Sequence, residues 1–309
     1  MSPENKGDVD EKSFINADKK KISCKYWVPN LSGDNEKPRA LVFICHGLGE
    51  HVRCYDSHAK MLADQGYLVF GHDHVGHGLS EGDRVHVNSF TEYTRDVLQH
   101  IDMILSENKD VPLFIIGHSM GGTIALKLGL EKPSLFSGMI LLGPAVKPNP
   151  ETATTFKVMA AKVVSRILPQ VGISPLEAKY MSRDPVVVEN YEKDPLVWHG
   201  NIKAKYDYVF NKDLIYISLS CYRQAVELLM AMNDIMNHMT EVSWPLLTIC
   251  GTDDKLIEPE GCTLLQEKAS SKDKTLKMIK GGLHQIHNEP EGVGTQCMED
   301  MRKWIQDHC

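Results

Sequence analysis

The chain has 309 residues, a formal net charge of −7, and an ordinary globular composition with 42% hydrophobic and 24% charged residues. That length can bury a large core, in one domain with an insertion or in two domains. A negative net charge without a basic block argues against nucleic acid as a partner. The 8 cysteines are scattered without C-x-x-C pairs, which favours a reducing, cytoplasmic location.

Residues 1–20 form a polar, charged leader without the apolar run of a signal peptide, and no apolar stretch reaches transmembrane length. Lys21 to Trp27 predicts an edge strand directly after this leader. Further strands are predicted at about 41–45, 67–72, 113–117 and 138–142, alternating with helices near 53–64, 91–106 and 120–131. Such alternation is typical of a mostly parallel α/β sheet flanked by helices.

A glycine turn of the form H-G-x-G follows the strand at 41–45, and its third residue is Leu48. We expect the backbone N–H of Leu48 to stabilise an oxyanion. The turn at 72–78, after the next strand, contains three histidines and an aspartate, which could bind a metal ion. Because Gly76 stands where a completing aspartate belongs, we expect neither a metal nor another cofactor.

Residues 117–121 read Gly-His-Ser-Met-Gly and follow an apolar strand directly. A catalytic serine must stand clear of the backbone, beside a base and near N–H donors, because its hydroxyl is a weak nucleophile. Flanking glycines permit the strained strand-to-helix turn that achieves this. The motif predicts a nucleophile elbow with Ser119 as nucleophile and the Met120 N–H as second oxyanion donor, rather than an ordinary turn.

Regular alternation stops after the strand at 138–142, so residues 143–244 are predicted to form a mainly helical cap inserted into a core of 21–142 and 245–309. Residues 154–168 show apolar side chains at helical spacing. Lys157, Lys162 and Arg166 lie on this predicted helix without a neighbouring acid. The helix is therefore expected either to pack on the main domain or to dip into a lipid surface.

The apolar strand predicted at 245–250 is followed by two adjacent aspartates, and one of them is the expected acid partner of the serine. We favour Asp254, because a residue four positions beyond the strand has room to turn back toward the site. Asp253 remains the alternative. This position, after the serine in the chain, suits an α/β-hydrolase, in which the order is serine, acid, histidine.

The last predicted strand, 275–279, leads into a glycine loop that ends at His284, the expected general base. His287 lies three residues further on, about one helical turn away. We therefore expect His287, together with His118 of the elbow, to contact substrate without acting as the base.

Several stretches carry a resemblance to a known family: 46–51, 70–78, 80–82, 96–100, 117–122 and 149–158. They resemble the monoglyceride lipases, which are serine hydrolases of the α/β-hydrolase fold. The stretch at 149–158 is the most specific, since it lies in the cap, where other hydrolases diverge. The resemblance implies the same nucleophile, acid, base and oxyanion donors, with Asp254 as the acid.

Some positions depart from the family pattern. In the H-G-x-G turn at 46–49, which we call the oxyanion loop, Leu48 replaces an alanine of the family. Trp198 and Ile257 replace cysteines, and the segment 207–224 is longer than its counterpart in the family. These departures are typical of a viral or otherwise divergent relative. They affect the expected acyl-chain preference and the sensitivity to thiol reagents.

We therefore expect a cytoplasmic serine hydrolase that cleaves monoacylglycerols to fatty acid and glycerol through an acyl-serine intermediate. Transient, peripheral contact with membranes through the cap is also expected. A lysophospholipase or general carboxylesterase is the nearest alternative, because it would use the same catalytic residues. A catalytically silent lipid-binding or partner-binding protein is the alternative from another class.

Overall fold

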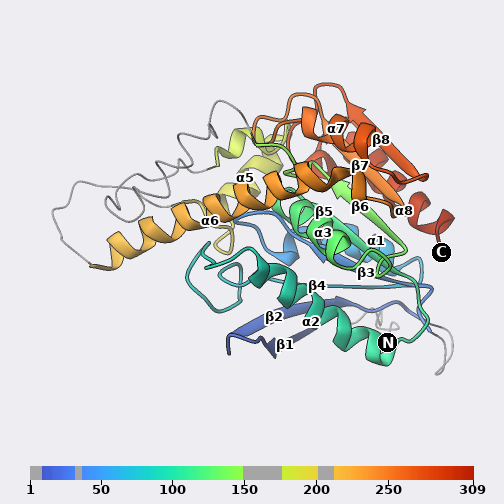
Figure 1. The fold of residues 1–309 in the computed structure, drawn as a ribbon, viewed down its shortest axis with the longest axis horizontal. Coiled ribbons are helices and arrows are strands. Elements are labelled where there is room, and N and C mark those ends of the chain that lie inside the picture. The colour runs from blue at the N-terminus through green and yellow to red at the C-terminus, as the bar shows by residue number, and fades with distance from the viewer. Residues whose placement is uncertain (1–8, 32–36, 149–175, 201–211) are drawn as a thin grey trace, which may run out of the picture.

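The computed structural model describes residues 9–31, 37–148, 176–200 and 212–309, and its described strands form one 8-stranded sheet (Figure 1). The strands are β1 (Val9–Ile15), β2 (Lys21–Trp27), β3 (Ala40–Cys45), β4 (Tyr67–His72), β5 (Leu113–His118), β6 (Gly138–Leu142), β7 (Leu246–Gly251) and β8 (Lys274–Ile279). Their order is β1-β2-β4-β3-β5-β6-β7-β8. The β1–β2 and β2–β4 pairs are antiparallel and the others are parallel, which confirms the predicted fold class.

Helices cover both faces of this sheet (Figure 1). The described helices and 3-10 turns are η1 (Val52–Tyr55), α1 (Asp56–Ala63), α2 (Thr91–Glu107), α3 (Met120–Glu131), η2 (Ala178–Tyr180), α5 (Pro185–Lys193), α6 (Lys212–His238), η3 (Met239–Glu241), α7 (Glu260–Lys268), η4 (Ile286–Asn288) and α8 (Val293–Asp307). Apolar side chains of α2, α3, α6 and α7 pack on one face, and those of α1 and α8 pack on the other.

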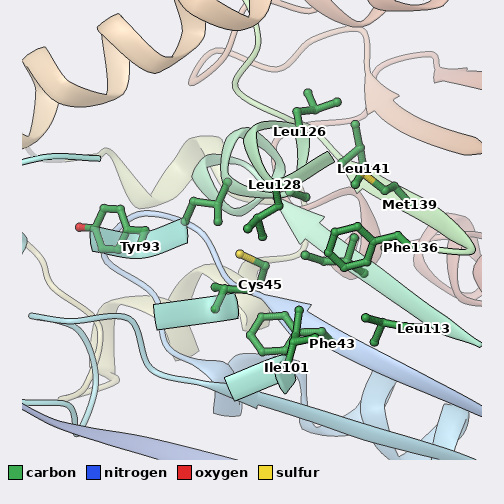
Figure 2. Close-up of a cluster of buried hydrophobic side chains, with 14 of the residues drawn as sticks. Phe43, Cys45, Tyr93, Ile101, Leu113, Leu126, Leu128, Phe136, Met139 and Leu141 are labelled. Carbon is green, nitrogen blue, oxygen red and sulfur yellow. The ribbon is translucent and has the colours of Figure 1, made fainter. Parts of the chain in front are cut away.

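The central strands are buried on both sides, and alternate residues supply the two halves of the core. Phe43 and Cys45 of β3 face α2 and α3, where Figure 2 shows them near Ile101. Val42 and Ile44, between them in sequence, pack on the opposite side. Burying each large apolar side chain contributes roughly 1.5–3 kcal/mol, so these strands hold the layers together.

The N-terminal edge differs from the prediction, because β1 lies inside the predicted polar leader and makes β2 an inner strand. Among residues 11–15, Phe14 is the one buried hydrophobic side chain, so this strand lacks the apolar pattern by which strands are predicted. Asn16 fixes the turn that follows, since its Oδ1 accepts the N–H groups of Asp18 and Lys20. Its Nδ2 donates to Asp96 of α2 over 2.8 Å, which anchors the turn.

Between β6 and β7 the described residues contain η2, α5, α6 and η3. The predicted helix at 154–168 lies outside the described residues, and the role of 143–244 as a cap stays a prediction. In the described part of the chain, no helix combines the length and apolar character needed to cross a membrane.

Candidate active site

Ser119 occupies the sharp turn between β5 and α3, with a φ of 52° and a ψ of −118°. A non-glycine residue with this backbone costs on the order of 1–3 kcal/mol, so the surrounding structure must hold it in place. The neighbouring glycines make the turn possible. A Cβ on Gly117 would lie 2.6 Å from the carbonyl oxygen of Gly121, and one on Gly121 would lie 1.9 Å from that of Cys45.

The loops after β7 and β8 bring an acid and a histidine together. The His284 Nδ1 lies 2.7 Å from the Asp254 Oδ2, and both residues are buried. The other carboxylate oxygen, Oδ1, accepts the N–H groups of Leu256 and Ile257. Asp253 is exposed and bonds its neighbour Thr252, so the structure pairs His284 with Asp254.

Electrostatics make this buried pair an ionised carboxylate and a basic imidazole. Burial opposes ionisation of Asp254, but the attraction and hydrogen bond of His284 and the two backbone donors lower its pKa. Burial likewise favours neutral His284, but the charge and hydrogen bond of Asp254 raise its pKa above the ordinary value. With Nδ1 committed to Asp254, the Nε2 is the nitrogen that can take a proton from a nearby hydroxyl.

The elbow and this pair meet at the end of β6. The N–H of Ser119 donates to the carbonyl oxygen of Leu142 over 3.1 Å. Gly143 follows with a φ of 45°, and a Cβ there would lie 3.2 Å from the carbonyl oxygen of His284 and 3.4 Å from the Asp254 Oδ2. The serine turn and the two partner loops therefore converge at the carboxyl edge of the parallel strands, where α/β folds place their sites.

The glycine turn after β3 lies against the start of α3, since a Cβ on Gly121 would overlap the carbonyl oxygens of Cys45 and His46. This contact brings the loop that carries Leu48 beside the helix that begins at Met120. Among the described residues, no acceptor engages the N–H of either residue. Two such donors beside the serine are what an oxyanion requires.

Glu50, directly after this turn, is a buried carboxylate that sequence reasoning missed. Its Oε2 accepts the Gly47 N–H at 3.0 Å and the Tyr55 hydroxyl at 2.7 Å, and lies 3.1 Å from the His118 Nδ1. Its Oε1 accepts the Gln285 side-chain amide at 2.8 Å. One carboxylate thus joins the oxyanion loop, the elbow and the loop of His284. The only sequence signal was an acid directly behind H-G-x-G.

His118 and His287 lie beneath the site. Both are buried, and their ring centroids are 5.0 Å apart. The His118 Nε2 lies 3.4 Å from the carbonyl oxygen of His284, while His287 stacks on Tyr55. His118 thus contacts the loop of His284 directly and His287 packs behind it, and the substrate contact expected of both residues stays a prediction.

The histidine-rich turn after β4 is organised by Asp73, which accepts N–H groups of Val52 and Leu79 and pairs with Arg53. Its histidines are buried among other rings of the main domain. In the described residues, donor atoms able to share one metal ion gather elsewhere and do not include this turn. These hydrogen bonds and ring contacts make the turn a packed polar element of the core.

Burial keeps the histidines of this turn neutral, together with the neighbouring His46 and His100. Desolvation lowers the pKa of His46 to about 4, and of His77 and His100 to about 3. It holds the pKa of His72 and His74 well below the ordinary value as well.

A family model described as "Serine aminopeptidase, S33" matches residues 36–291. Mouse monoglyceride lipase is 39% identical over 98% of this chain and 93% of its own length. The monoglyceride lipase homolog of monkeypox virus is 34% identical over 94% of this chain and 96% of its own. Among solved structures, Paleococcus ferrophilus monoacylglycerol lipase has a TM-score of 0.73 at 28% identity, covering 93% of this chain and 99% of that one.

The neutral histidines predict a loss of stability in mild acid. Below a pH of about 6.5 the unfolded chain binds protons at these sites while the folded chain does not, so the free energy of unfolding falls as pH falls. For His77 this window extends down to its folded pKa of about 3. Each such histidine contributes about 1.4 kcal/mol per pH unit within its window.

Urea unfolding between neutral pH and a pH near 5 measures this slope. His77→Gln should reduce the slope, even though the variant is less stable at every pH. His238→Gln is the matched control, because that side chain is 44% exposed, and it should keep the slope of the unmodified chain. A His77→Gln variant with an unchanged slope would place the proton uptake elsewhere.

Proposed function

We propose that this chain, which belongs to the monoglyceride lipase family of serine α/β-hydrolases, hydrolyses monoacylglycerols to a free fatty acid and glycerol. The observation that carries the proposal is the buried pair of Asp254 and His284, which lies at the same edge of the sheet as a serine held in a strained elbow. Near full-length similarity to monoglyceride lipases supports the choice of substrate.

In the proposed reaction, Ser119 Oγ attacks the ester carbonyl while the His284 Nε2 takes its proton. The N–H groups of Leu48 and Met120 stabilise the oxyanion. The bond from the carbonyl carbon to the glycerol oxygen then breaks, and His284 returns the proton to that oxygen. Water repeats the sequence on the acyl-serine and releases the fatty acid, while Asp254 fixes the imidazole tautomer. No cofactor takes part.

Trp198 and Ile257 differ from the family pattern beside the oxyanion loop and beside Asp254, which supports both a substrate preference and a response to thiol reagents of this chain's own. Trp198 lies over the oxyanion loop, where its backbone N–H donates to the Gly49 carbonyl oxygen at 2.8 Å and its side chain packs against that glycine. Ile257 is buried and donates its N–H to Asp254. The family resemblance has a cysteine at each of these positions, so thiol reagents that act there should be ineffective on this chain.

We further propose a cytoplasmic enzyme that contacts lipid surfaces transiently through residues 154–168. The support is the sequence pattern, an apolar stripe accompanied by Lys157, Lys162 and Arg166 without an acid.

The function is tested by comparing hydrolysis of a long-chain monoacylglycerol, lysophosphatidylcholine and a short ester. We expect the monoacylglycerol to be preferred. Ser119→Ala should lower kcat by roughly 10⁶-fold, leaving only the contribution of the oxyanion donors, and should abolish labelling by a fluorophosphonate probe. Preference for lysophosphatidylcholine would favour the lysophospholipase alternative, and labelling of the variant at another serine would refute the nucleophile.

The two neighbouring aspartates provide a matched test of the acid. Asp254→Asn should lower turnover by about 10⁴-fold, because the imidazole loses its tautomer and orientation. Its residual activity should extend to lower pH, since the carboxylate that raises the His284 pKa is gone. Asp253→Asn, on an exposed side chain, should leave both rate and pH profile nearly unchanged. The opposite ranking would move the acid to Asp253.

The lipid contact is tested by reversing charge at Lys162 and Arg166. Each basic residue near an anionic surface contributes on the order of 1 kcal/mol, so binding to anionic vesicles should weaken. Activity on dispersed monoacylglycerol should fall while that on a soluble short ester is retained. An equal fall on both substrates would make the segment a packing element of the cap.

A further inference from the structure

A second group of reactive side chains lies on the flank of the site and has no part in the proposed reaction. His51 directly precedes η1, Cys54 lies within η1, and Asp194 follows α5. One donor atom of each residue lies within 4.8 Å of those of the other two. These residues come from segments about 140 positions apart, and the fold brings them together.

The His51 ring is held inside this group. Its side chain is only 4% exposed, and its Nε2 lies 2.9 Å from the Asp194 Oδ2. Its other nitrogen, Nδ1, is buried without a hydrogen-bond partner. A bound water would satisfy Nδ1, so Nε2, the nitrogen that faces Asp194, is the one able to bind an ion shared with that carboxylate.

The other two donors suit a cation. Cys54 is a free thiol, and burial together with the nearby charges of Glu50 and Asp194 raises its pKa, so its surroundings are electronegative. A bound metal ion reverses that effect and takes the sulfur as thiolate. The Asp194 Oδ1 already accepts the Leu196 N–H, which orients the carboxylate, and 31% exposure of this side chain gives an ion access from solvent.

We propose that His51, Cys54 and Asp194 bind a zinc ion, with water as the fourth ligand. Mixed nitrogen, sulfur and oxygen donors are typical of zinc, whereas magnesium and calcium prefer oxygen alone. On binding, the Cys54 thiol releases its proton to solvent and the zinc–sulfur bond forms without any change of oxidation state.

Such an ion would link two segments that flank the oxyanion loop, the start of η1 and the segment from Asp194 to Trp198. His51 and Cys54 follow that loop in sequence, while Asp194 precedes the segment in which Trp198 donates to the Gly49 carbonyl oxygen. Zinc would therefore fix this segment to the start of η1. The inference does not depend on the hydrolase activity, since binding itself can be measured.

The experiment titrates chelator-treated full-length protein with zinc in competition with a chromophoric chelator. We expect a single ion per chain and a rise in Tm with zinc, because the ion binds the folded state. Cys54→Ser and Asp194→Asn should each weaken binding by at least about tenfold. Cys309→Ser is the matched control for an exposed thiol and should bind as the unmodified chain does.

Cobalt provides an independent readout, because a cobalt–thiolate bond gives a charge-transfer band that Cys54→Ser must lose. Asp194→Asn changes a partly exposed side chain, so it tests the site even if Cys54→Ser fails to fold. Absence of stoichiometric binding to the unmodified chain would overturn the proposal. Equal affinity in all variants, or loss of binding in Cys309→Ser alone, would overturn it as well.

Discussion

The close approach of backbone at the elbow is the constraint on which the rest of the site depends. The start of α3 packs directly on the end of β3, and only a residue without a Cβ fits at Gly121. This contact sets the serine turn beside the oxyanion loop. Main-chain packing therefore fixes the frame of the site, and the positions of the side chains depend on it.

Buried charge forms the second layer of this frame. The carboxylates of Asp254 and Glu50 are both buried, a state that is stable only when each is hydrogen bonded or paired. Each meets that condition through several donors from different loops. Asp254 is hydrogen bonded to one histidine, whereas Glu50 joins three loops. In the proposed reaction, the first carboxylate serves proton transfer and the second aligns the site.

The features that could be predicted from sequence are those determined by one continuous stretch of residues. The inner strands and the elbow are of this kind, as is the choice of Asp254 over Asp253 as the partner of His284. β1 could not be predicted, because it is polar and is held by pairing and by the Asn16 turn rather than by its own apolar pattern. Two of the partners of Glu50, His118 and Gln285, lie 68 and 235 residues away, a separation that no local pattern records.

The positive φ of Ser119 has a consequence for how such a chain can change over generations. Glycine adopts this backbone without strain, so Ser119→Gly would relieve about 1–3 kcal/mol of conformational cost while removing the hydroxyl. Selection for stability alone would therefore favour loss of the proposed nucleophile. A serine at this position opposes the backbone preference of the fold, and the chemistry proposed for it gives a reason for its presence.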